Sequence, residues 1–297
     1  MISGKEAGFL LLTCRFGDPN RKVLSASQLR ILGERMRTMP KPSQERDLEE
    51  GDLLAIGYSR EGAGRILSLL EDQELLSHYI RRGERLGCMP ISRVSERYPA
   101  ILKDRLGQET PGCLWAKGDL AVLDGPMIAL VGSRDIRPEN KAFAAEVGRQ
   151  AALQGYTLVS GNARGADRTA QAACLKAGGK VISIVADALA QKTLLNNVLY
   201  LSEDDFDEAF SAQRALSRNR IIHCLGEKTF VAQADLEKGG SWDGTVKNLR
   251  HGWSPVFCFD DGSDAMAQLS QMGGNLTYLE ELADIKALQN RYSSFLE

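Results

Sequence analysis

Residues Tyr156 to Gly179 read YTLVSGNARGADRTAQAACLKAGG, and this stretch decides the fold. A short apolar run leads into a glycine-rich loop that contains Arg164, and an alanine-rich helical pattern follows and ends at two glycines. Loop glycines let backbone N–H groups approach an anion, the helix start carries partial positive charge, and arginine can bind phosphate with two hydrogen bonds. The stretch therefore predicts a phosphate-binding turn, with Asp167 complementing the helix start. An ordinary strand-to-helix turn is the alternative, because small polar residues occur at many such turns.

A second loop of the same kind precedes this one. Residues Met127 to Arg134 (MIALVGSR) form an apolar run that stops at Gly132-Ser133-Arg134, and the amphipathic stretch Asn140 to Gln154 follows. This order predicts the first strand and helix of a βαβ unit. Because the carboxyl ends of parallel strands meet at one edge of an open sheet, Arg134 and Arg164 are expected to project into one crevice. The loop lacks the three glycines of the dinucleotide fingerprint, so NAD is disfavoured and no cofactor is expected.

Length and composition fit a globular protein of two domains. The chain has 297 residues, of which 43% are hydrophobic and 26% are charged, and domains usually have roughly 100–200 residues. No run of about 18 apolar residues occurs, and Lys5 and Glu6 precede the first short apolar stretch, so we expect no membrane span and no secretory signal. The expected location is the cytoplasm. The six cysteines and three histidines are scattered without metal-ligand spacing, which predicts buried reduced thiols and no metal site.

The net charge of −2 argues against a generally basic surface. Nucleic-acid-binding domains with such a surface have a high pI, so any nucleic-acid binding must be local. The acidic run Glu203 to Glu208 is expected to be a solvated loop and helix start that repels DNA.

The C-terminal half continues the alternation of strand and helix. Apolar runs predict strands at Lys180–Ala186, Thr229–Ala234 and Pro255–Phe259, and helical patterns lie at Phe206–Leu225 and Ser263–Met272. The alternation predicts an α/β fold with an extended, Rossmann-like, doubly wound and mostly parallel sheet.

Two further motifs in this half carry polar groups. Arg218-Asn219-Arg220 lies within the long helical pattern, where successive side chains point in different directions, so Asn219 and one of the two arginines are expected to reach the crevice. A solvated helix face is the alternative. Residues Gly239 to Thr245 (GGSWDGT) open another helix and predict a third anion-binding turn, in which Trp242 either stacks on a base or packs under the loop.

The N-terminal part has a different pattern. Residues Leu53 to Leu70 are apolar and helical on both sides of a glycine-bearing turn, which predicts a helix-hairpin-helix. Such a hairpin can present N–H groups to a DNA phosphate, although it is as often a packing unit. We expect a small helical domain (helix-hairpin-helix or SAM-like) over residues 1–106, and a sheet domain over residues 107–297. Residues Gly107 to Gly125 are the candidate linker, and Glu280 to Glu297 the expected helical tail.

Several motifs, in this order, resemble the DprA/Smf family of DNA-processing proteins. They are Ile128–Arg134, Val159–Asp167, Ala177–Gly179 and Arg218–Ile222, preceded from about residue 98 by Tyr98–Leu102 and Leu114–Asp119. The resemblance implies an extended Rossmann-like fold, single-stranded DNA binding in the crevice, a homodimer, and transfer of the strand to a RecA-type recombinase. We expect no catalysis, and we expect the helical tail in place of the C-terminal winged-helix domain of the family. The chain departs from the family pattern at Gln171, at Gln233 and over Ala186–Lys192.

The expected DNA ligands come from the three turns and the Arg-Asn-Arg motif. They are Gly132, Ser133, Arg134, Ser160, Gly161, Asn162, Arg164, Gly165, Asp167, Arg218, Asn219, Arg220, Gly240, Ser241 and Thr245. A nucleotide-binding sensor, for example in phage defense, is the alternative. A phosphoribohydrolase of the LOG type is disfavoured, because Asn248 stands where that motif has a glutamate.

Overall fold

The computed structural model describes residues 3–39 and 46–291, which form two compact units. The first unit contains the chain up to Tyr98 together with Gly107–Trp115 and Glu203–Phe206; the second contains Pro99–Leu106, Ala116–Ser202 and the chain from Asp207 onward. In the described part of the chain, no helix combines the length and the apolar character needed to cross a membrane.

The division of the chain differs from the expected boundary after residue 106. Residues Gly107 to Gly125 are not a linker, because they contain strand β2 (Cys113–Lys117), whose five residues are all buried. Three of the four glycines in this stretch have positive φ, with 52° at Gly107, 125° at Gly118 and 98° at Gly125. They therefore mark tight turns before and after a core strand.

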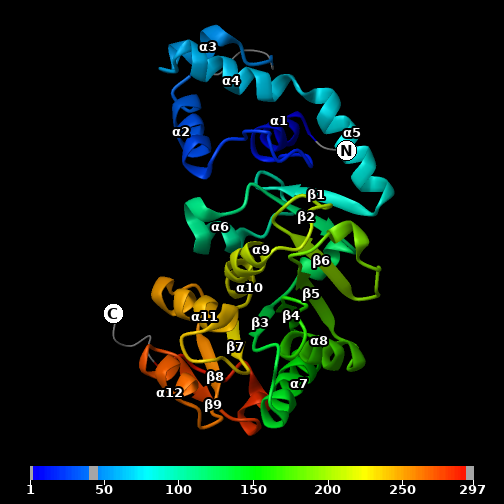
Figure 1. Cartoon of the computed structure of the whole chain (residues 1–297), viewed down its shortest axis with the longest axis vertical. Coiled ribbons are helices and arrows are strands. Elements are labelled where there is room, and N and C mark those ends of the chain that lie inside the picture. The colour runs from blue at the N-terminus through cyan, green and yellow to red at the C-terminus, as the bar shows by residue number, and fades with distance from the viewer. Residues whose placement is uncertain (1–2, 40–45, 292–297) are drawn as a thin grey trace. The chain divides into compact units, whose positions relative to one another are not determined.

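The second unit is built on parallel strands in the order β6-β5-β4-β3-β7-β8-β9 (Figure 1). Their bounds are β3 Met127–Val131, β4 Thr157–Ser160, β5 Lys180–Ile184, β6 Val198–Ser202, β7 Lys228–Val231, β8 Val256–Phe259 and β9 Asn275–Thr277. Ala129 in β3 aligns with Val159 on one side and with Thr229 on the other. These strands are buried almost throughout, as expected for parallel strands covered on both faces.

Helices cover both faces of this sheet. Helices α7 (Pro138–Leu153) and α8 (Ala166–Lys176) pack together against β3, β4 and β5, while α10 (Asn219–Leu225) packs on the opposite face beside α6 (Ala100–Leu106) and α11 (Gly239–His251) (Figure 1). The strand order reverses at β3, which lies between β4 and β7. The doubly wound Rossmann-like fold predicted from the sequence is confirmed, and its reversal point is where open sheets bind ligands.

The prediction of one long helix over Phe206 to Leu225 is wrong. Two short helices replace it, α9 (Ala212–Ser217) and α10. Phe206 belongs to the first unit, where its ring stacks on Tyr79 with 4.4 Å between centroids. The helix begins only after Ser211, whose hydroxyl caps it by accepting from the Arg214 N–H at 3.1 Å.

The C-terminal tail is also not the helix that we expected. After α12 (Asp264–Gln271) and β9, the described residues form a 3-10 helix at Glu280–Asp284 and no further helix up to residue 291; residues 292–297 lie outside the described residues. The side chain of Gln154 donates to the Leu282 carbonyl and accepts from the Ile285 N–H, both at 2.8 Å. These bonds occupy backbone groups that a continuing helix would pair.

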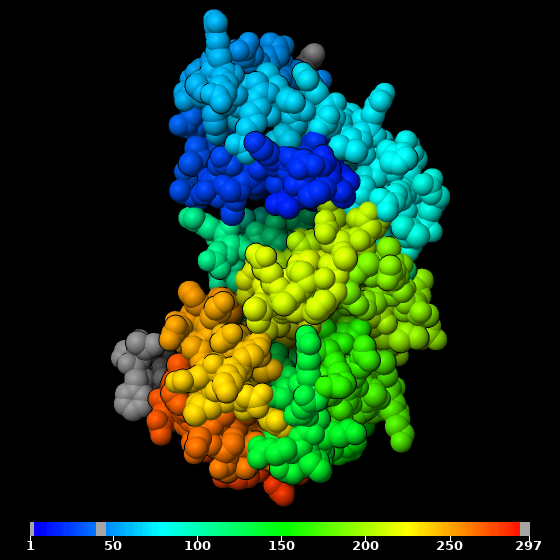
Figure 2. Space-filling view, in the orientation of Figure 1, coloured from blue at the N-terminus to red at the C-terminus, as the bar shows by residue number. Residues whose placement is uncertain are grey.

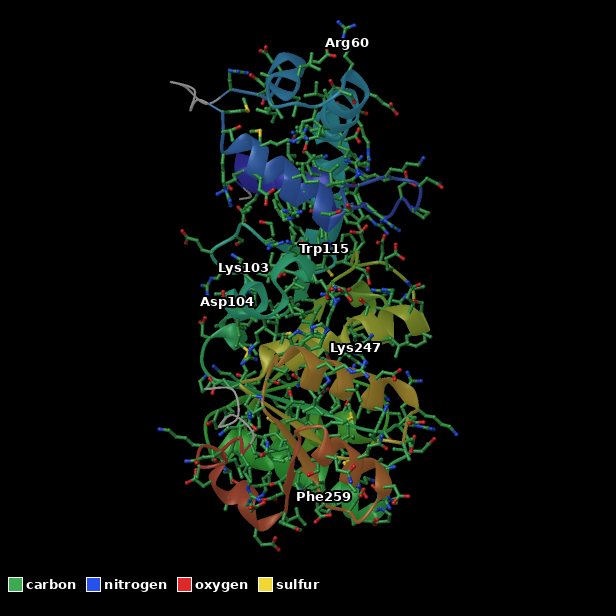
Figure 3. All side chains as sticks on the ribbon, turned by 90° about the vertical axis from the view of Figure 1, so that its left-hand side faces the viewer. Arg60, Lys103, Asp104, Trp115, Lys247 and Phe259 are labelled. Atoms are coloured by element: carbon green, nitrogen blue, oxygen red, sulfur yellow. The ribbon has the colours of Figure 1, made fainter. Side chains whose placement is uncertain are left out.

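Segments that are distant in the chain meet on one face of the second unit. In the space-filling view, the yellow-green surface around residues 207–217 meets the green surface of the first half of the sheet (Figure 2). In the core of this unit, Phe259 of β8, which is labelled in Figure 3, stacks on Phe143 of α7 with 4.5 Å between ring centroids. All six cysteines are buried and none of them forms a disulfide within the described residues, as predicted.

The first unit is mainly helical. It contains α1 (Gly4–Thr13), α2 (Ala26–Met36), α3 (Glu50–Ala55), α4 (Arg60–Glu71), α5 (Gln73–Arg85) and the short strand β1 (Cys88–Ser92). Helices α3 and α4, with Gly57 between them at φ 88°, form the hairpin expected at Leu53 to Leu70. Whether this hairpin contacts DNA stays a prediction.

Candidate functional site

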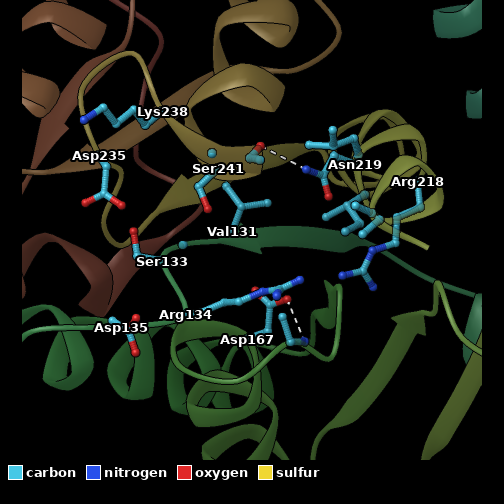
Figure 4. Close-up of a pocket in the computed structure, with 18 residues that line it drawn as sticks. Val131, Ser133, Arg134, Asp135, Asp167, Arg218, Asn219, Asp235, Lys238 and Ser241 are labelled. Carbon is cyan, nitrogen blue, oxygen red and sulfur yellow. Dashed lines mark hydrogen bonds between the residues drawn. The ribbon is translucent and has the colours of Figure 1, made fainter. Parts of the chain in front are cut away.

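A cavity of about 380 Å³ lies at the carboxyl ends of β3, β4 and β7, within the second unit. Loops from these three strands line it together with α9 and α10 (Figure 4). Its polar lining residues are Ser133, Arg134, Asp135, Asp167, Arg218, Asn219, Asp235, Lys238 and Ser241, and Gly132 and Gly240 also line it. The two arginines expected in one crevice, Arg134 and Arg164, do lie in neighbouring loops, but Arg164 lines two adjoining hollows and not this cavity.

The loop after β3 is fixed by Gln233. The Ser133 N–H donates to the Gln233 carbonyl at 3.0 Å, the Gln233 side-chain oxygen accepts from the Arg137 N–H at 2.9 Å, and its amide donates to the Asp135 carbonyl at 3.1 Å. A residue that departs from the family pattern therefore holds the backbone on both sides of Arg134. The exposed side chain of Arg134 projects over the cavity (Figure 4).

The loop after β4 packs directly against the loop after β3. A Cβ atom at Gly165 would overlap the carbonyl oxygens of Ser133 and Arg134, and the φ of Gly165 is 86°. Both observations require glycine at this position. The contact places the start of α8 beside Arg134.

Asp167 lies buried in the first turn of α8. Its carboxylate accepts from the Ala163 N–H at 3.1 Å, so it closes the loop as the sequence predicts for a helix-start residue. Burial raises its pKa from 3.8 to about 6, and the positive charges of Arg218 and Arg134 oppose that rise. The carboxylate therefore balances two arginines inside the site.

Arg218 is a bracing residue as well as a lining residue. Its side chain is buried, and one guanidinium nitrogen donates to the carbonyls of Gly161 and Ile184, which links the ends of β4 and β5. Burial lowers its pKa, although guanidinium stays charged. In Figure 4 the guanidinium groups of Arg134 and Arg218 point toward one another from opposite sides of the cavity.

The N-terminus of α11 forms the remaining wall. Lys238 is exposed at the position that precedes the helix, and no side chain caps the first turn. Asn219 donates to the Gly240 carbonyl at 2.9 Å, which ties α10 to this turn. Trp242 is only 6% exposed, so it packs under the loop and does not present a stacking surface.

Two more hollows adjoin the cavity and share Arg134 with it. One, of about 300 Å³, has Arg164, Arg168, Lys192 and Phe210 in its wall; the other, of about 880 Å³, is open and has Arg137, Lys141, Arg164 and Arg168. Asp135 pairs with Arg164 at 2.5 Å and Asp187 pairs with Lys192 at 2.6 Å. A locally positive surface therefore surrounds Arg134 in a chain whose net charge is −2.

Most of the predicted ligands line these three hollows. They are Gly132, Ser133, Arg134, Gly161, Asn162, Arg164, Gly165, Asp167, Arg218, Asn219, Gly240 and Ser241. Three of them line none: Ser160 is buried against Gln171, Thr245 is buried and donates to the Ser241 carbonyl, and Arg220 lies half-buried on α10.

Among the lining residues that sequence reasoning missed are Arg168, Phe210, Asp235 and Lys238. Lys238 immediately precedes the Gly-Gly turn, so its position next to a predicted helix start was an available signal.

Comparison with known proteins assigns the family. The model of the family described as DNA recombination-mediator protein A matches residues 90–286. The chain belongs to this family. It is 30% identical over 223 residues to the DNA processing protein DprA of Bacillus subtilis, which covers 70% of this chain and 72% of that one. It is 34% identical over 141 residues to the DprA of Streptococcus pneumoniae, covering 44% and 50% of the two chains.

Solved structures agree with this assignment. The X-ray structure of DprA from Streptococcus pneumoniae has a TM-score of 0.70, 23% identity, and a match covering 96% of each chain. A structure of DprA from Helicobacter pylori, solved to describe its single-stranded DNA binding mode, has a TM-score of 0.56 and 25% identity, covering 66% of this chain and 94% of that one. The resemblance to the DprA/Smf family is thus confirmed, and the fold is shared along the chain.

Proposed function

We propose that this protein binds single-stranded DNA along the three hollows, through contacts with the phosphate backbone, and that it does so without catalysis. The observation that carries the proposal is the position of Arg134, which lines all three hollows and has further cations on each side. A row of cations that follows a groove is how proteins track a single strand without reading its sequence. The Helicobacter pylori relative, whose structure concerns single-stranded DNA binding, supports the proposal.

The shape of the site favours a single strand over a duplex. The cavity and the smaller hollow have volumes of about 380 and 300 Å³. A flexible strand can turn successive phosphates into such hollows, whereas duplex DNA is stiff over about 150 base pairs. We therefore expect a preference for single strands.

The chemistry of the lining residues supports binding and not catalysis. Asp167 is committed to a backbone N–H, and Asp135 and Asp187 are paired with cations. Asn248, which replaces the glutamate of the LOG-type motif, is fully buried, donates to Ser254 at 3.0 Å and contacts a ring nitrogen of His223 at 3.1 Å. It therefore lies on the buried face of α11 and does not line the cavity.

A nucleotide sensor remains the second candidate, because one observation favours it. The volume of about 380 Å³ falls in the range of small-molecule sites, and the uncapped start of α11 can accept a terminal phosphate. The same turn would hold a free nucleotide or a phosphate within a chain.

The experiment that separates the two candidates is a fluorescence-anisotropy titration with an oligo-dT strand and the matching duplex, at two salt concentrations. ATP, AMP and cyclic nucleotides are added as competitors. Salt-sensitive preference for the strand, unaffected by mononucleotides, is the expected result. Absence of strand binding, or displacement by a low concentration of one nucleotide, would transfer the assignment to the sensor.

Membership of the family extends the proposal to partners and to location. We infer that the protein acts in the cytoplasm, forms a homodimer and passes the bound strand to a RecA-type recombinase. Sedimentation velocity of the full chain tests the dimer. A strand-exchange assay tests the transfer. It compares how much recombinase loads onto a single strand that carries this protein and onto a strand without it.

A further inference from the structure

Phe210 is an exposed aromatic ring inside the basic site. It is 56% exposed and lies in the wall of the smaller hollow, together with Arg134, Arg164 and Lys192. Other large aromatic side chains of the second unit lie in its core: Trp242 and Trp253 are 6% exposed and Phe230 is fully buried. Tyr278 is exposed as well, but it lines none of the three hollows. A phenylalanine that is more than half exposed beside several cations leaves much of its apolar surface available to a ligand.

The chain fixes the position of this ring. Phe210 directly precedes Ser211, the residue that caps α9. The guanidinium group of Arg214 donates to the carbonyls of Glu208 at 2.7 Å and Ala209 at 2.6 Å, and also to the Ala186 carbonyl at 3.0 Å. The loop that carries Phe210 is therefore tied to the end of β5, which reduces the entropy lost when a ligand orders the ring.

The same local sequence explains why the ring stays uncovered. An apolar residue before a helix cap usually packs on the fourth residue of the helix. In α9 that residue is Ala215, which has only a methyl group. The ring is thus positioned but not covered by its own helix.

We propose that Phe210 is the base-stacking residue of this site, so that a base of the bound strand packs on its ring while the adjacent cations hold the neighbouring phosphates. The inference rests on the proposed function. Stacking of a base on an aromatic ring tolerates any base, because every base has a π face, and it complements a groove that binds only phosphates. The site would therefore distinguish a strand with bases from a bare polyanion.

The test compares two strands of equal length, oligo-dT and an abasic strand with the same number of phosphates. Phe210→Ala is expected to weaken oligo-dT binding by about 5- to 100-fold, the loss that removal of one stacking aromatic produces. Its affinity for the abasic strand is expected to stay within about twofold of the unmodified protein, because the phosphate contacts are unchanged. Phe210→Tyr should restore oligo-dT binding, and Phe210→Leu, which is apolar but not aromatic, should not.

Tyr278→Ala is the matched control. Tyr278 is 49% exposed, and it lines none of the three hollows. Its removal should leave both affinities unchanged. Phe210→Trp places a new, exposed indole at this position, and binding of oligo-dT should quench its fluorescence. The signal can be assigned to this residue because the three native tryptophans, including Trp115, are buried.

Two results would overturn the inference. One is an unchanged oligo-dT affinity in Phe210→Ala while the unmodified protein binds in a salt-sensitive way, which would leave the proposed function intact. The other is an equal loss on both strands, which would assign Phe210 to the fold or to a protein contact. Failure of the unmodified protein to bind either strand would instead refute the proposed function itself.

Discussion

Replacing Arg134 by alanine should weaken strand binding and also change its salt dependence. Arg134 is exposed and lines all three hollows. A hydrogen bond to a charged group contributes about 1.5–3 kcal/mol, so loss of one arginine–phosphate contact should weaken binding by about 10- to 100-fold at low salt. Among the described residues, Arg134 alone lines all three hollows, so neighbouring cations cannot fully replace it.

The salt dependence gives a second magnitude. Each phosphate neutralised on a single strand contributes about 0.7 to the slope of log K against log salt concentration. If the slope of the variant is smaller by about 0.7, its affinity falls about threefold less than that of the unmodified protein when the salt concentration rises from 50 to 200 mM. The defect of Arg134→Ala should therefore be about threefold larger at 50 mM than at 200 mM.

Lys247→Ala is the control for net charge. Lys247 is exposed on α11 and lines none of the hollows (Figure 3), so this change removes one positive charge from the same unit without removing a contact. Anisotropy titrations of oligo-dT at four salt concentrations give the affinity and the slope for each variant. If Arg134→Ala and Lys247→Ala have the same affinity and the same slope, Arg134 does not contact phosphate and the assignment of the site is wrong.

Three further predictions concern stability and reactivity. The pKa of Asp167 is about 6 in the folded protein and 3.8 as a free side chain. The folded state therefore binds this proton more tightly, which adds about 3 kcal/mol to the free energy of unfolding below pH 3.8, and this contribution is lost as the pH rises through 6. Asp167→Asn should flatten this dependence, measured by urea unfolding at pH 4 and 7; an unchanged slope would contradict it. Gly161→Ala places a Cβ 2.5 Å from the Arg218 guanidinium and should lower stability by about 1–3 kcal/mol, whereas Gly64→Ala, with open space around it, should not lower the melting temperature. All six thiols are buried and should react with DTNB only after unfolding; rapid reaction of any thiol in the native protein would be inconsistent with its burial.

The sheet and its turns could be predicted because their signals are local. The runs Ile128 to Val131 and Leu158 to Val159 are apolar throughout, as buried parallel strands require, and each is followed by glycine and a cation. The topology of parallel strands then places these turns at one edge without further information. This is why Arg134 and Arg164 could be assigned to neighbouring loops from the sequence.

The long helix and the linker could not be predicted, because tertiary contacts decide them. Phe206 fits the helical pattern of the residues after it, yet its ring is fully buried among Tyr79, Trp115 and other aromatic side chains. Residues Gly107 to Gly125 have the glycine content of a linker, but the five residues of β2 are all buried. Burial against residues distant in the sequence outweighs local propensity in both places.

The roles of individual side chains within the motifs were equally inaccessible. Thr245 belongs to the third turn, but its hydroxyl donates to the Ser241 carbonyl at 2.7 Å and lies inside α11. Arg218 is predicted to bind phosphate, and no signal in the sequence indicates that it also donates hydrogen bonds to backbone carbonyls. The exposure of Phe210 depends on the size of Ala215, a detail with no periodic signal.

The carboxylates beside the cations explain how an acidic chain can hold a polyanion. Asp135 and Arg164 are 88% and 72% exposed, and Lys192 pairs with Asp187, so both basic side chains already have a partner in the unbound protein. The exposed pair of Arg164 with Asp135 contributes only about 0–1 kcal/mol, so a phosphate can displace that carboxylate at little cost, and a charge-assisted bond to phosphate is stronger. The carboxylates therefore position the cations and lower the affinity for isolated ions, while a strand that offers several phosphates at once displaces them together. Asp135→Asn should accordingly strengthen binding of a single phosphate or of AMP relatively more than binding of a long strand.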